Sequence, residues 1–242
     1  MGFAKQYRTA EAASRAVAQH AWLDALGMPV PDLIAHHPQV LEFQYLPGRH
    51  ALPDDVPAVA RLLGQTHAAA HQVALHSVRL DQGFDLPGIG RMSAFTASRI
   101  ARVRHNMGAA MVPGPALSID RAVHIIEASA DEPAAFYKDS NPRNFLITPT
   151  TITAVDFDDL TPAPFAYDLA KLLVTTAMTH GPLPAGLSAK ALAAYNVETP
   201  YRCSPDRLAD WMEIHHILTS PYLGRNGYTH SWHTLRRNER TE

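Results

Sequence analysis

The stretch FYKDSNPRNFLITPTTITAVDFDDL, residues 136–160, determines how the rest of this chain is interpreted. It holds two apolar runs, Phe145–Ile147 and the β-branched run 151–155, which are separated only by Thr148-Pro149-Thr150. β-Branched and aromatic residues favour strands, and the Thr-Pro-Thr segment favours a turn. Two strands joined by so short a turn must be antiparallel. The stretch therefore predicts a β-hairpin.

Polar residues lie at both ends of this hairpin. Asn144 begins the first strand and Asp156 follows the second, so antiparallel pairing should place them side by side. Pro142 disfavours a helical conformation for the residue before it, which should keep the segment from Asp139 to Asn144 an open loop over the same edge. We therefore expect Asp139, Asn144 and Asp156 to converge. The alternative is a hairpin flanked by solvated polar turns.

Such a convergence has a specific chemical use. One carboxylate and one amide oxygen can hold a metal ion, while a second carboxylate can accept a proton. These groups are the minimum equipment for magnesium-assisted phosphoryl transfer.

The segments before and after the hairpin carry different patterns. Residues 3–7 alternate as in a strand, Thr9 can cap a helix that ends at Gly27, and residues 32–48 indicate two more short strands. Beyond Asp55, apolar residues recur at helical spacing. The segments concerned are 56–71, 92–107, 117–129, 168–178, 189–196 and 205–218. We expect an α+β chain with a small strand-rich part, residues 1–47, and a mainly helical part, residues 48–242, that ends in a loose polar tail.

The composition narrows the classes of function. The chain has 242 residues, of which 46% are hydrophobic and 18% charged, with a net charge of −2. Without a basic excess, nucleic acid is not an expected partner. The single cysteine, Cys203, allows no internal disulfide and suits a reducing compartment. No segment reaches 18 apolar residues and the N-terminus lacks a signal-peptide pattern, so we expect a cytoplasmic protein without a membrane partner.

Several motifs resemble those of the aminoglycoside phosphotransferase and choline kinase family, which has a protein-kinase-like fold. YKDSNPRN is similar to the catalytic loop of that family, VDFDDL to its metal-binding motif, and PFAYDLAKLL to its Asp-Leu-Ala helix. LEFQYLPG resembles the hinge that holds adenine. The resemblance covers about residues 3–200. It implies two lobes: a small, truncated β-rich N-lobe and a larger, mainly helical C-lobe that carries the catalytic loop and the metal-binding hairpin.

The resemblance also implies a function: a phosphotransferase that uses ATP or another nucleoside triphosphate with Mg²⁺ and acts on a hydroxyl of a small molecule. It implies that Asp139 is the catalytic base, that Asn144 and Asp156 bind the metal, and that Asp168 supports the catalytic loop. The residues that it places at the nucleotide are Lys5 for the phosphates, and Phe43, Gln44 and Leu46 for adenine.

The chain also departs from the family pattern. Only four residues precede Lys5 in this sequence, where the family pattern has two strands and a Gly-rich loop, so we expect a truncated N-lobe. Ala16 stands where the helix should supply a Glu to that lysine. Lys138 replaces a glycine of the catalytic loop; it could contact the transferred phosphate or only solvent, and we favour solvent. These departures keep a second hypothesis open, a catalytically inactive kinase-like module that binds a nucleotide, a metabolite or a partner protein.

Two other enzyme classes with acidic motifs fit the sequence less well. A haloacid dehalogenase needs Thr where the chain has Leu160, and a glycosyltransferase Asp-x-Asp site needs a nucleotide-sugar domain before it. Arg99, Arg102 and Arg104 are expected to form a solvated helix face, with the alternative that they border an anionic substrate. His215 and His216 are expected at the surface or half-buried.

Overall fold

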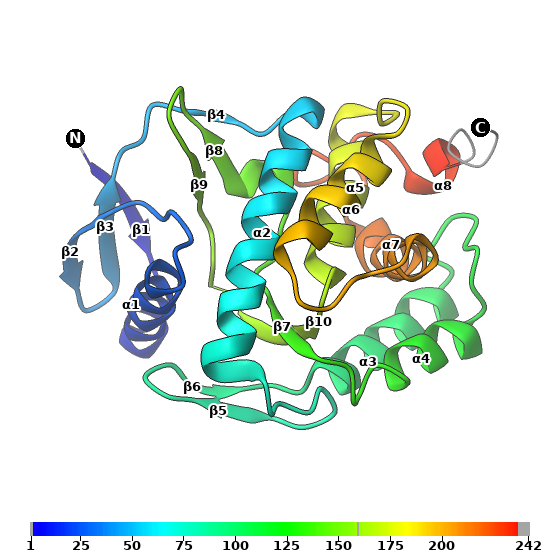
Figure 1. Ribbon diagram of the computed structural model, residues 1–242, viewed down its shortest axis with the longest axis horizontal. Coiled ribbons are helices and arrows are strands. Elements are labelled where there is room, and N and C mark those ends of the chain that lie inside the picture. The colour runs from blue at the N-terminus through cyan, green and yellow to red at the C-terminus, as the bar shows by residue number, and fades with distance from the viewer. Residues whose placement is uncertain (1, 159, 237–242) are drawn as a thin grey trace.

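The computed structural model describes residues 2–158 and 160–236, and its N-terminal part is a small sheet with one helix beside it (Figure 1). The sheet has the strand order β1-β3-β2, and both pairs are antiparallel. Its elements are β1 Gly2–Gln6, α1 Ala10–Ala25, β2 Leu33–His37 and β3 Val40–Gln44. The three strands and the helix confirm the elements expected before residue 48.

The ends of α1 follow from its sequence. The extended Thr9 caps the helix by accepting a hydrogen bond from the backbone N–H of Ala12 at 3.1 Å. At the other end Gly27 has a φ of 78°, the left-handed conformation that stops a helix. Both boundaries were predictable because they depend only on local chemistry.

The remainder of the chain is mainly helical. Its helices are α2 Val56–Ala70, α3 Phe95–Gly108, α4 Ile119–Glu127, α5 Tyr167–His180, α6 Leu187–Glu198, α7 Pro205–Thr219 and α8 Trp232–Leu235. A π-helical turn spans His71–Leu75, and 3₁₀ turns span Pro53–Asp55, Pro142–Asn144 and Ser220–Tyr222. The first six helices coincide with the segments of helical periodicity, which confirms the α+β class; the division at residue 48 stays a prediction.

Short strands connect these helices. They are β4 Arg49–His50, β5 Phe84–Leu86, β6 Gly90–Met92, β7 Ala134–Tyr137, β8 Phe145–Ile147, β9 Ile152–Ala154 and β10 Thr161–Pro164. The predicted hairpin is β8 with β9, and its antiparallel register pairs Phe145 with Ala154. The backbone N–H of Ala154 also donates to the carbonyl of Pro29 at 2.8 Å, so the hairpin is tied to the N-terminal part.

Two regions differ from the sequence expectation. The β5–β6 and β7–β10 pairs were not expected, because these short strands, unlike the run 151–155, contain almost no β-branched residues. The chain after α7 is not simply loose, since Tyr228 and Trp232 are buried in the core. The last part of the predicted tail, residues 237–242, lies outside the described residues.

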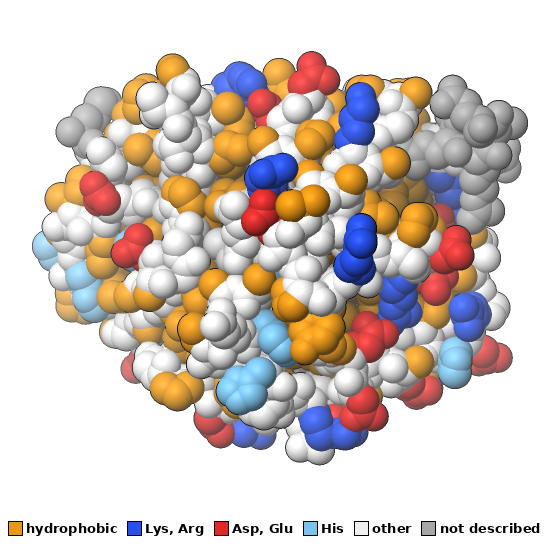
Figure 2. Space-filling model, in the orientation of Figure 1, with side chains coloured by type: hydrophobic (Ala, Val, Ile, Leu, Met, Phe, Trp, Pro, Cys, Tyr) orange, Lys and Arg blue, Asp and Glu red, His pale blue; other side chains and the backbone are white. Residues whose placement is uncertain are grey.

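The surface shows no dominant charge. Figure 2 shows acidic and basic side chains interspersed on one face of the molecule. Within residues 2–158 and 160–236, no helix is both long and apolar enough to cross a membrane.

Contact between α2 and α6 positions the start of α5. The Tyr195 hydroxyl on α6 lies 2.8 Å from Nδ1 of His67 on α2 and accepts a hydrogen bond from the backbone N–H of Ala166 at 2.9 Å. Ala166 precedes α5 and has a left-handed φ of 64°. Burial lowers the pKa of His67 to about 3, so this imidazole is neutral. The two helices therefore hold the residue from which α5 begins.

Gly64→Ala tests this packing. Alanine normally stabilises a helix interior relative to glycine, by about 0.5–1 kcal/mol. Here the added Cβ would lie 2.7 Å from the backbone carbonyl oxygen of Tyr195, so α2 and α6 would have to separate. We expect the free energy of unfolding, measured by urea denaturation, to fall by about 1–3 kcal/mol. Gly108→Ala is the control, because a Cβ there meets nothing within 4 Å; equal stability of the two variants would contradict this account.

Candidate active site

The loop after β7 is held around Asp139 by one buried carboxylate. Asp168, in the first turn of α5, accepts hydrogen bonds from the backbone N–H of Lys138 at 3.1 Å and of Ser140 at 2.8 Å, and from the Ser140 hydroxyl at 2.8 Å. Asp139, between them, has a φ of 64°, which is uncommon for a residue with a side chain. These three hydrogen bonds to Asp168, called the clamp, thus fix a backbone conformation of Asp139 that would otherwise cost about 1–3 kcal/mol.

This conformation leaves the Asp139 side chain 34% exposed. The Tyr137 hydroxyl donates to its Oδ1 at 2.7 Å, and Lys171 Nζ on α5 lies 3.2 Å from the same oxygen. Burial raises the pKa of Asp139, but the charge of Lys171 and the hydrogen bonds from Tyr137 and Lys171 outweigh it, so the pKa is lowered. The carboxylate is therefore ionised at neutral pH and still reachable.

Lys138 does not face solvent, so that expectation was wrong. Its side chain is fully buried, with Nζ 4.6 Å from the centroid of the Phe145 ring and 3.5 Å from the Val155 carbonyl. Burial lowers the pKa of Lys138, and the neighbouring Asp168 charge opposes that shift. The side chain lies beneath the hairpin, where a four-carbon stem can pack against apolar residues.

Asn144 and Asp156 lie at the same end of the hairpin. The backbone N–H of Val155, next to Asp156, donates to the Asn144 carbonyl at 2.9 Å. The Asn144 side-chain nitrogen donates to the Asp139 carbonyl at 2.8 Å, which leaves the amide oxygen as the atom that could bind a cation. Hydrogen bonds thus join Asn144 to the loop of Asp139 and to the strand that precedes Asp156.

Lys5 reaches this end of the hairpin from β1. Its Nζ lies 2.7 Å from Oδ1 of Asp156 and 2.7 Å from Oδ2 of Asp158. Burial lowers the pKa of Lys5, but the hydrogen bonds and charges of Asp156 and Asp158 raise it by more. In the family pattern a glutamate on the helix pairs with this lysine, and here that position is the buried Ala16. Lys5 pairs with Asp156 and Asp158 instead. Asp158 was missed because only the folded chain brings it to Lys5.

The residues expected at adenine lie around the end of β3. Phe43 is buried, with its ring centroid 5.7 Å from that of His20 and 6.1 Å from that of Phe157. The Gln44 N–H donates to the Asp32 carbonyl at 2.8 Å, and the Leu46 carbonyl accepts from Gly48 at 2.9 Å. Those two backbone groups are engaged within the chain, so the roles of Phe43, Gln44 and Leu46 stay predictions.

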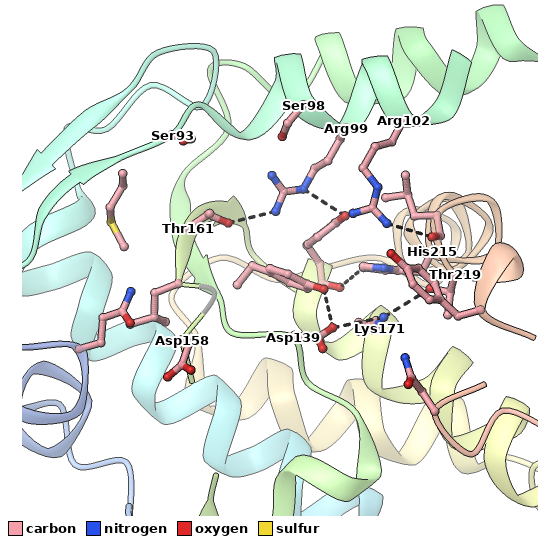
Figure 3. Close-up of a pocket in the computed structure, with 18 of the residues that line it drawn as sticks. Ser93, Ser98, Arg99, Arg102, Asp139, Asp158, Thr161, Lys171, His215 and Thr219 are labelled. Atoms are coloured by element: carbon pink, nitrogen blue, oxygen red, sulfur yellow. Dashed lines mark hydrogen bonds and ion pairs between the residues drawn. The ribbon is translucent and has the colours of Figure 1, made fainter. Parts of the chain in front are cut away.

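A pocket of about 550 Å³ opens beside Asp139. Figure 3 shows Asp139 and Lys171 on one side of it and Arg99 and Arg102 of α3 on the other. The pocket is also lined by Arg15, Arg91, Tyr137, Asp158, Thr161, Tyr167, His215 and Thr219. Space beside a reachable carboxylate suits a small molecule that presents a group to Asp139.

Three side chains near this pocket are buried, although the sequence predicted them to be exposed or half-buried. Arg99 is 7% exposed and so is not part of a solvated helix face. His215 and His216 are buried, and their Nε2 atoms lie 2.9 Å from the carbonyls of Tyr167 and Pro113, respectively. Burial lowers the pKa of both imidazoles. They were misjudged because the apolar pattern of α7 does not show that it is covered on several sides.

No protein cage for a metal ion is present in the described part of the chain. Across residues 2–158 and 160–236, no three or more His, Cys, Asp or Glu side chains form a group that could hold a metal ion. The candidate donors at the hairpin are instead one amide and one carboxylate. Magnesium is commonly bound in this way, through one or two protein ligands together with substrate phosphates and water.

Comparison with known proteins gives a consistent assignment. The model of the phosphotransferase enzyme family matches residues 3–205. An aminoglycoside-3′-phosphotransferase of type VIII is 21% identical with a TM-score of 0.53, and the match covers 89% of this chain and 84% of that one. A choline/ethanolamine kinase family protein from Mesorhizobium loti is 16% identical with a TM-score of 0.60, covering 100% and 76%. An amicoumacin kinase in complex with AMP-PNP and Ca²⁺ is 16% identical with a TM-score of 0.58, covering 85% and 69%.

These similarities confirm the predicted protein-kinase-like fold and the resemblance to the aminoglycoside phosphotransferase and choline kinase family. No curated protein matches the chain.

Asp168→Asn tests the clamp. The amide nitrogen would face backbone N–H donors instead of accepting from them, and buried Lys138 would lose a neighbouring negative charge. We expect the free energy of unfolding in urea to fall by about 2–4 kcal/mol. The control is Asp24→Asn at an exposed position of α1, expected within about 0.5 kcal/mol of the unmodified chain. An Asp168 variant as stable as this control would show that the clamp is unimportant.

Proposed function

The chain belongs to the phosphotransferase enzyme family, and we propose that it transfers the terminal phosphoryl group of ATP, or another nucleoside triphosphate, to a hydroxyl of a small molecule. The observation that carries this proposal is the geometry of Asp139. An ionised carboxylate is fixed by the clamp of Asp168 and opens onto a pocket of about 550 Å³.

Asp139 would act as the base that orients the acceptor. Its carboxylate accepts the proton of the acceptor hydroxyl, the hydroxyl oxygen bonds to the terminal phosphorus, and the bond from that phosphorus to the bridging oxygen breaks. The nucleoside diphosphate leaves with the electron pair of that bond. A carboxylate with a lowered pKa is a weak base, so its main contribution is to hold the hydroxyl in line for attack.

Lys171 would position Asp139. The ammonium is buried and lies 3.2 Å from Oδ1 of Asp139, while Thr219 Oγ1 on α7 lies 3.4 Å from Nζ. The lysine keeps the carboxylate ionised and, together with the Tyr137 hydroxyl, binds its Oδ1. The other oxygen is then available to the acceptor.

The end of the hairpin fits a nucleotide-bound Mg²⁺. The Asn144 amide oxygen and the Asp156 carboxylate are hard oxygen donors, and phosphate oxygens would complete the coordination. When bound, the metal would neutralise charge on the phosphates. Lys5, which lies between Asp156 and Asp158, would bind phosphate oxygens next to the metal.

The cytoplasmic location and the absence of a nucleic-acid partner stay predictions from the composition.

The first test distinguishes the role proposed for Asp139 from the role proposed for Asp156. Asp139→Asn should lower kcat for transfer from Mg·ATP by about 10²–10⁴-fold, because the acceptor loses its base, while Mg·ATP affinity measured by titration calorimetry stays within about twofold. Asp156→Ala should instead abolish the magnesium-dependent part of nucleotide binding.

Asp24→Asn is the control for both variants and should leave both quantities unchanged. Full turnover in both acid variants would refute the roles given to Asp139 and Asp156. If the unmodified chain binds Mg·ATP but transfers phosphate to no hydroxylated compound, the inactive binding module is the better description.

Lys171→Met tests the positioning role through the pH profile. The base works only when deprotonated, and in the unmodified chain its pKa is lowered, so kcat should stay constant down to pH values below the usual carboxyl range. Without Lys171 burial dominates and the pKa of Asp139 rises. The acidic limb of kcat should then move up by at least about one pH unit. Lys190→Met on the exposed side of α6 is the control; coincident acidic limbs for the two variants would contradict the role of Lys171.

A further inference from the structure

Among residues 2–158 and 160–236, the side chains that line the pocket beside Asp139 are more often positive than negative. The described basic residues are Arg15, Arg91, Arg99, Arg102 and Lys171, and the described carboxylates are Asp139 and Asp158. Both carboxylates already have a cation, since Lys171 pairs with Asp139 at 3.2 Å and Lys5 with Asp158 at 2.7 Å. Arg91 pairs with Asp85 at 2.7 Å.

Three of these cations have no such partner. Among residues 2–158 and 160–236, no carboxylate lies within 4.0 Å of the guanidinium of Arg15, Arg99 or Arg102. The described lining therefore carries positive charge that the described acids do not neutralise. An uncompensated charge in a partly enclosed pocket attracts ligands of the opposite sign.

Of the three arginines without a carboxylate partner, Arg99 is the most informative, because its side chain is buried. Its Nε donates to the Tyr167 hydroxyl at 3.2 Å, and its two terminal nitrogens donate to the carbonyl of Phe95 at 3.0 Å and to Thr161 Oγ1 at 3.0 Å. All three acceptors are neutral. A guanidinium has five N–H groups, so these bonds hold Arg99 in place without neutralising it. Burying a charge in this way is costly unless a partner of opposite charge is supplied.

Arg102 extends the same site. It lies three residues after Arg99, on the same face of α3, and donates one hydrogen bond to the Leu218 carbonyl at 3.2 Å. Figure 3 shows Arg99 and Arg102 projecting side by side from α3 into the pocket. Arg104, on the same helix, is exposed and does not line the pocket.

The electrostatics of His215 agree with this arrangement. Burial lowers the pKa of His215 well below its usual value, and the positive charges of Lys171, Arg99 and Arg102 lower it further. The imidazole is therefore neutral and adds no charge of its own. The charged groups that act on His215 are thus the positive side chains of Lys171, Arg99 and Arg102.

These positive side chains lie close to the proposed base. The Arg99 guanidinium carbon lies 5.3 Å from the centroid of the Tyr137 ring, and the hydroxyl of that ring donates to Asp139 at 2.7 Å. One tyrosine side chain therefore separates the guanidinium from the carboxylate. A ligand a few bonds long can reach both.

We propose that the acceptor is an anion, a hydroxylated small molecule whose carboxylate or phosphate group binds Arg99 and Arg102 while its hydroxyl lies against Asp139. The inference rests on the proposed phosphotransferase function, which gives Asp139 its role. A cationic acceptor such as an amino sugar would be repelled by the same guanidinium groups. A carboxylate and a phosphate group can each accept a pair of hydrogen bonds from one guanidinium.

Matched acceptor series test the charge preference. One series is glucose, glucosamine, gluconate and glucose 6-phosphate, and the other is glycerol, 2-amino-1,3-propanediol, glycerate and glycerol 3-phosphate, each with γ-labelled Mg·ATP. We expect kcat/KM for the anionic members to exceed that for the neutral and cationic members by about tenfold or more. The carboxylate and phosphate members then show which oxyanion is preferred.

Arg102→Gln should raise KM for the preferred anionic member by about tenfold or more, with kcat and KM for Mg·ATP unchanged within about twofold. Arg104→Gln, which removes the same charge from the same helix outside the pocket, should leave all three constants unchanged. A preference for neutral or cationic members, or equal KM values in the two variants, overturns the proposal.

Calorimetric titration of the same anions without nucleotide separates this inference from the proposed function. Binding that Arg102→Gln weakens and Arg104→Gln does not, without phosphate transfer to any member, supports the anion site and contradicts phosphotransfer. Transfer only to neutral or cationic members supports phosphotransfer and overturns the anion site. Absence of anion binding to the unmodified chain also overturns it.

Discussion

The candidate site depends on the hydrogen bonds between the buried Asp168 carboxylate and the loop that carries Asp139. Two backbone N–H groups and one hydroxyl, all from Lys138 and Ser140, meet this carboxylate at 2.8–3.1 Å. Between these two residues Asp139 takes a left-handed conformation, and its carboxylate contacts Tyr137 and Lys171. Burial raises the pKa of Asp168, and the charge of Lys138 with these hydrogen bonds opposes that shift. Asp168 lies on α5, and the Tyr195 hydroxyl of α6 holds the residue before that helix. The position of Asp168 therefore depends on the packing of α2 against α6.

The parts of the fold that were predictable depend on local chemistry. The hairpin follows from two apolar runs and a short turn, and α1 from a Thr cap and a terminal glycine. The relation between Asn144 and Asp156 followed from antiparallel geometry, which needs no knowledge of the remaining chain. Strands β5, β6, β7 and β10 could not be recognised, because they are short and, unlike the hairpin, contain almost no β-branched residues.

The parts that were missed depend on contacts between distant segments. Lys138 was expected in solvent, but its stem is buried beneath the hairpin, and Arg99 was expected on an open face that α3 does not have at that position. The ion pairs of Lys5 with Asp158 and of Lys171 with Asp139 join residues far apart in the sequence. No local pattern marks such pairs. The sequence thus indicated Asp139, Asn144 and Asp156, but not the pairing of Lys171 with Asp139 or of Lys5 with Asp158.

A crystal structure with Mg²⁺ and a non-hydrolysable ATP analogue tests the central claim most directly, because it locates nucleotide, metal and base together. The account predicts that Asn144 Oδ1 and the Asp156 carboxylate coordinate the metal, that Lys5 contacts phosphate oxygens, and that the terminal phosphate faces Asp139 across the pocket. A nucleotide bound elsewhere, or a terminal phosphate directed away from Asp139 with no metal contact to Asp156, would contradict it.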